Sequence, residues 1–148
     1  MKTIKKTIDI NTSKENVWKV LTEDRYNRIW FAEFMEGTHA VTDWKVNSTV
    51  IFKDAGGNGL IGKIAASKPQ ELLSIEYTGM LLNNKEDYES ADALAAKGGR
   101  EIYELSGKGN VTHLSVLGDM PEELFNTMSN AWEKALDKLK TTAENIKN

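Results

Sequence analysis

The sequence has no cysteine among its 148 residues, and it has only two prolines and two histidines. The lack of cysteine excludes disulfide bonds, thiol nucleophiles and thiolate metal ligands. No HExxH motif, GxSxG motif or paired histidine spacing is present either. The sequence therefore indicates no metal site, no nucleophile triad and no cofactor.

The chain also lacks a basic excess and a long hydrophobic run. Its 19 lysines and arginines are outnumbered by 22 aspartates and glutamates, so the formal net charge is −3. A protein that grips nucleic acid needs a concentrated basic face, so we expect no nucleic-acid partner. No segment approaches membrane-spanning length, and the lysines of MKTIKKTIDI are not followed by the apolar region of a signal peptide. We expect a cytoplasmic protein without membrane insertion.

What is present is an ordinary globular composition, with 40% hydrophobic and 28% charged residues. The length suits a single domain over residues 1–148. Alternating isoleucines predict a strand over 3–10. Thr12 and Glu15 then have the spacing of a capping box for a helix over about 13–22. The next stretch, EDRYNRIWFAEF, predicts a short second helix or a loop, and it is dense in aromatic residues: Tyr26, Trp30, Phe31 and Phe34.

The rest of the chain changes to strand periodicity and ends in a helix. The alternating segments are HAVTDW, NSTVIFKD, LIGKIAAS, ELLSIEYTGM, REIYELS and VTHLSVLG. Residues 83–99 are polar and alanine-rich, so they predict a surface loop with a weak helix. Asp119 and Glu122, with Pro121 between them, predict a capping box for a long amphipathic helix of roughly 35–40 Å. This order of elements predicts an α+β fold.

One glycine-rich segment matches two phosphate-binding patterns. GNGLIG, over 57–62, fits the dinucleotide fingerprint, and the addition of Lys63 nearly completes a P-loop. Both motifs need a helix that begins at the glycines. Here the alternating LIGKIA favours a strand, and Ile64 stands where a P-loop needs a hydroxyl. We interpret GGNG as a hairpin turn and predict no nucleotide binding.

The titratable residues give no catalytic assignment. Glu76 and Glu104 lie in strands whose opposite faces carry the apolar side chains, so they are expected in solvent. Both faces of the strand around His113 are partly apolar, so the direction of its side chain stays open. No carboxylate partner for it can be assigned.

The aromatic and sulfur-bearing residues at expected inward positions are the remaining signal. For any one of them, core packing is the simpler interpretation. As a set, they bring polar tips of tyrosine and tryptophan into an apolar cleft, which is typical of a small-molecule pocket. The candidate pocket residues are Trp30, Phe34, Phe52, Ile64, Ile75, Tyr77, Tyr103, Met128 and Trp132.

Several strings in this order resemble the START-like (SRPBCC) superfamily. They are VWKVLTEDRYNRIW, VTDWKVNSTVIF, GLIGKIAASKPQELLSIEY, and GNVTHLSVLGDM followed by NAWEKALDKLK. The last pair resembles the branch named for the activator of heat-shock-protein-ninety ATPase. The resemblance implies a helix-grip fold, in which a curved antiparallel sheet of about six to seven strands wraps a long C-terminal helix. Two short helices near the N-terminus close one end, and a hydrophobic cavity lies between sheet and helix.

The resemblance also implies a function, which is the binding of a small hydrophobic or amphipathic molecule in that cavity. The aromatic connection over 26–34, with Met35, would line the mouth, and residues 83–99 would act as a lid. One alternative is a polyketide cyclase or aromatase-like enzyme, with Tyr77, Tyr103 or His113 as acid or base. Another alternative is a co-chaperone-like protein-interaction module. We expect no room for a second domain and find no matching basic motif, so the sequence gives no support to a chaperone partner. Oligomeric state stays open.

Overall fold

The computed structural model describes residues 1–147, and all eight of its strands lie in one antiparallel sheet. The order across the sheet is β1-β8-β7-β5-β4-β3-β2, and β6 pairs with the end of β5. The strands are β1 (Lys2–Ile10), β2 (His39–Val41), β3 (Thr49–Lys53), β4 (Gly59–Lys68), β5 (Leu72–Leu82), β6 (Lys85–Asp87), β7 (Arg100–Lys108) and β8 (Val111–Met120).

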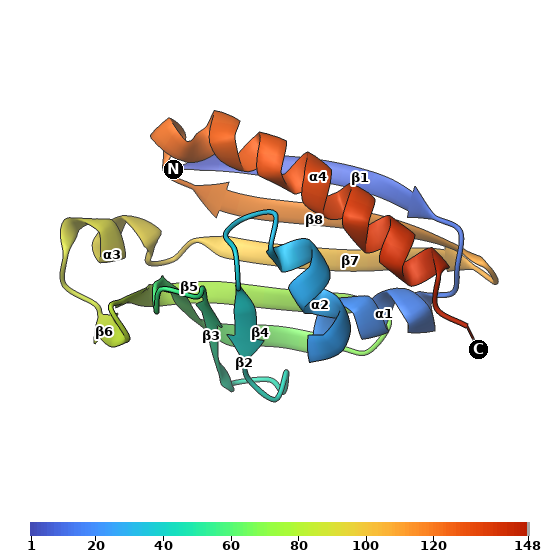
Figure 1. Ribbon diagram of the computed structural model, residues 1–148, viewed down its shortest axis with the longest axis horizontal. Helices are drawn as coiled ribbons and strands as arrows, with labels where there is room; N and C mark the ends of the chain where they lie inside the picture. Colours follow the sequence, from blue (N-terminus) through green and yellow to red (C-terminus); the bar gives the residue numbers. More distant parts are fainter. Residues whose placement is uncertain (148) are drawn as a thin grey trace.

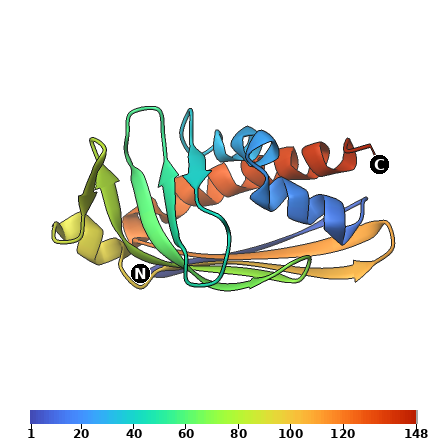
Figure 2. The same ribbon diagram turned by 90° about the horizontal axis from the view of Figure 1, so that it is seen from below.

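The sheet is curved, and the helices lie on its concave side. In Figure 2 the strands β1, β8 and β7 form a shallow floor, and β3 and β2 stand upright beside the helices. The paired strands β4 and β5 lie partly in the floor and partly in the upright part. Two register shifts between β4 and β5, at Ile61/Gly62 and Ile64/Ala66, lie where the sheet bends. Such irregularities increase the local bend and twist of a strand pair. The α+β helix-grip prediction is confirmed.

Two short helices follow β1, as the sequence predicted. They are α1 (Lys14–Thr22) and α2 (Asp24–Phe31), joined at Glu23, and both pack against the C-terminal helix α4 (Figure 1). The predicted capping box at Thr12 was wrong by one residue. The N-cap is Ser13, whose hydroxyl accepts a hydrogen bond from the backbone N–H of Asn16 at 3.3 Å. Thr12 instead accepts a bond from the Asn16 side chain at 2.8 Å.

The C-terminal helix α4 (Phe125–Glu144) crosses the concave face (Figure 1). The predicted cap at Asp119 was wrong, because Asp119 belongs to β8 and binds the Arg100 guanidinium at 2.7 Å. After Pro121 the chain makes one 3₁₀ turn over Glu122–Leu124 before α4 begins. At 1.5 Å per residue, α4 is therefore roughly 30 Å long, shorter than expected.

The core lies between α4 and the sheet. Buried residues of α4 form a stripe at helical spacing: Trp132, Ala135, Leu136, Leu139 and Ala143. The segment 83–99 contains β6 and a short helix, α3 (Ala91–Ala96), which Ser90 caps. It is tied to β5, since the Gly98 amide donates to the Tyr77 carbonyl at 2.9 Å.

The glycine-rich segment forms no phosphate-binding helix. Gly57 lies in the turn between β3 and β4 with a φ of 78°, and the residues after it are strand. The hairpin interpretation is confirmed. Among the described residues, no helix is both long and apolar enough to cross a membrane.

Candidate functional site

The nine predicted pocket residues come together between the sheet and α4. Six are buried and three are partly buried against the same core; the buried ones are Trp30, Ile64, Ile75, Tyr77, Tyr103 and Trp132, and the partly buried ones are Phe34, Phe52 and Met128. The ring centroids of Trp30, Tyr103 and Trp132 lie 6.1 Å from one another, and Phe34 packs on Trp132 at 4.8 Å. These contacts place the nine in one cluster, and their role in ligand binding stays a prediction.

The polar centre of this cluster is Glu101, which is not among the nine predicted residues. Strand alternation along REIYEL places Glu101 on the same face as Tyr103 and Leu105. The Tyr103 hydroxyl donates to Glu101 Oε2 at 2.6 Å, and the Tyr77 hydroxyl donates to Glu101 Oε1. The same period that predicted Tyr103 to face inward was therefore sufficient to find Glu101.

Burial controls the protonation of these three groups. It raises the pKa of the Glu101 carboxyl, and the hydrogen bonds from Tyr103 and Tyr77 only partly offset this effect. Burial, followed by the negative charge of Glu101, raises the pKa of both tyrosines well above their usual value. At neutral pH the tyrosines are therefore hydrogen-bond donors. The carboxyl keeps its proton to a higher pH than an exposed glutamate.

A glycine is the cross-strand neighbour of Glu101. Gly118 of β8 is paired with Glu101 and faces the same side. A Cβ atom placed on Gly118 would lie 3.8 Å from Trp132 Nε1 and 3.9 Å from Met120 Cε, which are ordinary van der Waals distances. A single methyl group would therefore fit at Gly118, bordered by the Trp132 and Met120 side chains.

His113 is not part of this cluster. It lies on the outer side of the sheet, and its Nδ1 is 2.7 Å from Oδ1 of Asp9, its partner in the register of β1 and β8. The two side chains are 47% and 71% exposed. This placement removes His113 from the candidate acids and bases of the interior. Glu76 and Glu104 are exposed, as predicted. No cluster of three or more possible metal ligands occurs within residues 1–147.

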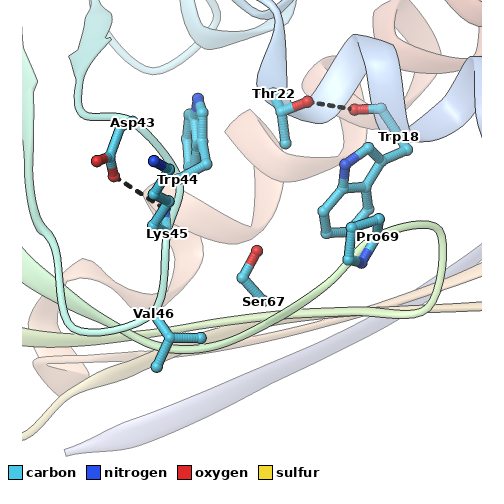
Figure 3. Close-up of a pocket in the computed structure, with 8 residues that line it drawn as sticks. All are labelled: Trp18, Thr22, Asp43, Trp44, Lys45, Val46, Ser67 and Pro69. Atoms are coloured by element: carbon cyan, nitrogen blue, oxygen red, sulfur yellow. Dashed lines mark hydrogen bonds between the residues drawn. The ribbon is translucent and has the colours of Figure 1, made fainter.

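A separate groove opens on the outside of the molecule, between α1, the loop over 42–48 and the turn between β4 and β5 (Figure 3). Its volume is about 460 Å³. None of the nine predicted residues lines it, and its two tryptophans, Trp18 and Trp44, were not among the predicted site residues.

No family model matches the sequence, and neither does any curated protein. Solved structures do match the fold. The protein MLL2253 from Mesorhizobium loti superposes with a TM-score of 0.77 at 14% identity, covering 99% of this chain and 100% of that one. The Aha1 dimer from Colwellia psychrerythraea gives 0.74 at 19% identity, covering both chains fully. DynU16, from the dynemicin biosynthetic locus, gives 0.70 at 12% identity over 97% of this chain and 47% of that one.

These similarities concern the fold, which is the helix-grip fold that the resemblance to the START-like (SRPBCC) superfamily implied. A fold of this kind hosts different functions, so function is argued from the site.

Proposed function

We propose that the protein binds a small amphipathic molecule between the sheet and α4, with the polar end of the ligand at Glu101. The observation that carries the proposal is the convergence of the Tyr77 and Tyr103 hydroxyls on one inward-facing carboxyl. Burial of a carboxyl carries a desolvation cost that apolar packing would avoid. A group retained at such a cost inside an apolar cluster is a candidate for a functional site.

The surroundings of Glu101 define the ligand by its chemistry. Apolar and aromatic side chains favour a hydrophobic body, with Met128 and Trp132 on the helix side and Phe34 and Phe52 beside them. An ionised ligand head would meet the carboxyl in a poorly hydrated place, so an anionic head is disfavoured. A neutral hydroxyl or carbonyl group can instead exchange hydrogen bonds with Glu101 and the tyrosines. We therefore expect a neutral, oxygen-bearing head.

Dodecan-1-ol and dodecanoate test this proposal, because they share a chain and differ in the charge of the head. We expect the alcohol to raise the melting temperature and to shift the indole N–H signals of Trp30 and Trp132 in a ¹H–¹⁵N NMR spectrum. At a hundredfold excess over its Kd, a ligand stabilises the folded state by about 2.7 kcal/mol. Dodecanoate should bind more weakly at neutral pH.

Glu101→Gln and Glu104→Gln form a matched pair of variants, since the two glutamates lie on opposite faces of β7. Glu101→Gln should reduce the preference for the alcohol over the carboxylate, whereas Glu104→Gln should leave it unchanged. The proposal fails if neither compound moves the Trp30 and Trp132 signals or the melting temperature.

The same observation favours a second candidate, which is an enzyme that acts by proton transfer. A carboxyl with a raised pKa can protonate the carbonyl oxygen of a bound ketone and so weaken the neighbouring C–H bond, with water as the base. Deuterium uptake next to the carbonyl of dodecan-2-one in D₂O, followed by NMR, tests this activity. Faster uptake with the protein, lost in Glu101→Gln and kept in Glu104→Gln, would establish it. Binding without uptake would leave the carrier function alone.

A further inference from the structure

The groove on the outside of the molecule has the construction of a second, separate binding site. Trp18 of α1 and Trp44 of the loop over 42–48 stand on opposite sides of it, and the Ser67 hydroxyl points into the space between them (Figure 3). Both tryptophans are partly buried, so each holds one part of its ring in the protein and offers another part to the groove. The volume of about 460 Å³ is in the range of small-molecule sites.

The loop that carries Trp44 is held in an unfavourable conformation by specific hydrogen bonds. Trp44 has a φ of 61°, in the left-handed region that side chains other than glycine, asparagine and aspartate seldom adopt. Asp43 Oδ1 accepts from the Lys45 amide at 2.9 Å, and the Asn47 amide donates to the Ile64 carbonyl at 2.8 Å. Persistent strain of this kind tends to occur at functional sites, and here it presents an aromatic ring.

Charge at the groove selects the kind of ligand. Lys45 is the cationic side chain of its lining, and Asp43 is the anionic one. The hydrogen bond from Ser48, and then that from the Lys45 amide, lower the pKa of Asp43 and keep it ionised. Its carboxylate is directed toward its own loop and away from the space between the tryptophans (Figure 3). Lys45, whose charge also acts on Asp43, is therefore the cation that the lining offers to an anionic ligand.

We infer that this groove binds a flat aromatic acid, with the ring against Trp18 and Trp44 and the acidic group near Lys45 and Ser67. Indole faces pack well against flat aromatic rings, and an ammonium group attracts a carboxylate. The inference does not depend on the interior site. The residues that line the groove do not include Glu101, Tyr77 or Tyr103.

The four tryptophans make the two sites separately observable. With 2-naphthoate as the probe, the indole N–H signals of Trp18 and Trp44 should shift on titration, while those of Trp30 and Trp132 stay in place. Cyclohexanecarboxylate, which has the same charge without a flat ring, should bind at least tenfold more weakly. Naphthalen-2-ylmethanol, which has the ring without the charge, should be weakened severalfold.

Two variants assign the contacts. Trp44→Ala should abolish the naphthoate shifts at Trp18. Lys45→Gln changes an exposed residue, so the fold should persist, and naphthoate should then bind no better than the alcohol. Tyr88→Ala serves as a matched control, since it removes an exposed aromatic residue that does not line the groove. Shifts confined to Trp30 and Trp132, or no shift with any probe, would overturn the inference. Cellobiose binding at Trp18 and Trp44 in the absence of naphthoate binding would also overturn it, in favour of a sugar site.

Discussion

Two carboxylates at adjacent register positions of β7 and β8 have opposite environments. Glu101 is on the concave face, where two tyrosine hydroxyls donate to it beneath α4. Asp119 is on the outer face, where it accepts from the Arg100 guanidinium at 2.7 Å and from the Thr3 hydroxyl at 2.6 Å. Asp119 follows Gly118, the register partner of Glu101, and successive side chains along a strand point to opposite faces.

The protonation of the two groups differs accordingly. Burial dominates at Glu101 and raises its pKa. Burial also acts on Asp119, but the hydrogen bonds from Arg100 and Thr3 outweigh it and lower the pKa of that carboxyl. The outer face thus pairs its charge with a cation, as a structural site does. On the concave face the Glu101 carboxyl accepts hydrogen bonds from neutral hydroxyl groups. These bonds can be exchanged for hydrogen bonds to a ligand.

Removal of the Trp132 ring, which α4 places over the concave face, should have the largest effect on stability. Trp132→Ala deletes a buried ring that contacts Trp30, Phe34 and Tyr103, so we expect a loss of about 3–5 kcal/mol in the free energy of unfolding. Urea unfolding measures it. Lys134→Ala, two residues away and exposed, should change stability by less than about 0.5 kcal/mol. Equal effects of the two substitutions would mean that α4 does not cover the cluster.

Removal of the charge on the outer face should have an intermediate effect. Asp119→Asn leaves the Arg100 guanidinium without a charged partner, and we expect a loss of about 1–3 kcal/mol at neutral pH. Because the folded pKa of Asp119 lies below its unfolded value near 3.8, its contribution is present above that value. It should disappear as the pH falls through the folded pKa. A loss that stays constant down to low pH would contradict the pairing.

Glu101→Gln should have the smallest effect and the opposite pH dependence. The folded pKa of Glu101 is raised above 4.5, so the folded state binds more protons than the unfolded state between the two values. The stability of the wild-type protein relative to Glu101→Gln should therefore be highest below about pH 4.5 and fall as the pH rises through the folded pKa. Unfolding curves at several pH values test the sign. A difference that does not change with pH would show that Glu101 is solvated, and one that grows with pH would show that it is paired with a cation.

The strand periodicity carried most of the fold prediction. The alternating segments became β1, β2, β3, β4, β5, β7 and β8, since burial of one face of a sheet requires period two. The errors fell at helix ends. Thr12 and Asp119 have the right spacing for capping boxes, but each side chain found another partner in three dimensions, Asn16 and Arg100 respectively. A local pattern cannot report a competing partner that comes from elsewhere in the chain.

The candidate sites show the same limit in different ways. The inward position of Glu101 could be predicted from the sequence, because Glu101 shares a strand face with Tyr103. Its hydrogen bond to Tyr77 could not, because that bond depends on the pairing of β5 with β7. The groove between Trp18 and Trp44 could not be predicted from the sequence. It joins residues of α1, a strained loop and a distant turn, and none of these segments carries a period that points to the others.

The sequence by itself determined the α+β class, the strands with the C-terminal helix, and the set of inward aromatic residues, since period is a property of neighbours along the chain. The curvature of the sheet was an expectation that came only from the resemblance to a known superfamily. The tertiary structure decided which polar groups meet. It brought two tyrosines to one carboxyl on the concave face, sent His113 to the outer face, and placed two tryptophans across an open groove. The physical reason is that hydrogen bonds and ring contacts depend on distances of a few ångströms between segments that are far apart in the chain.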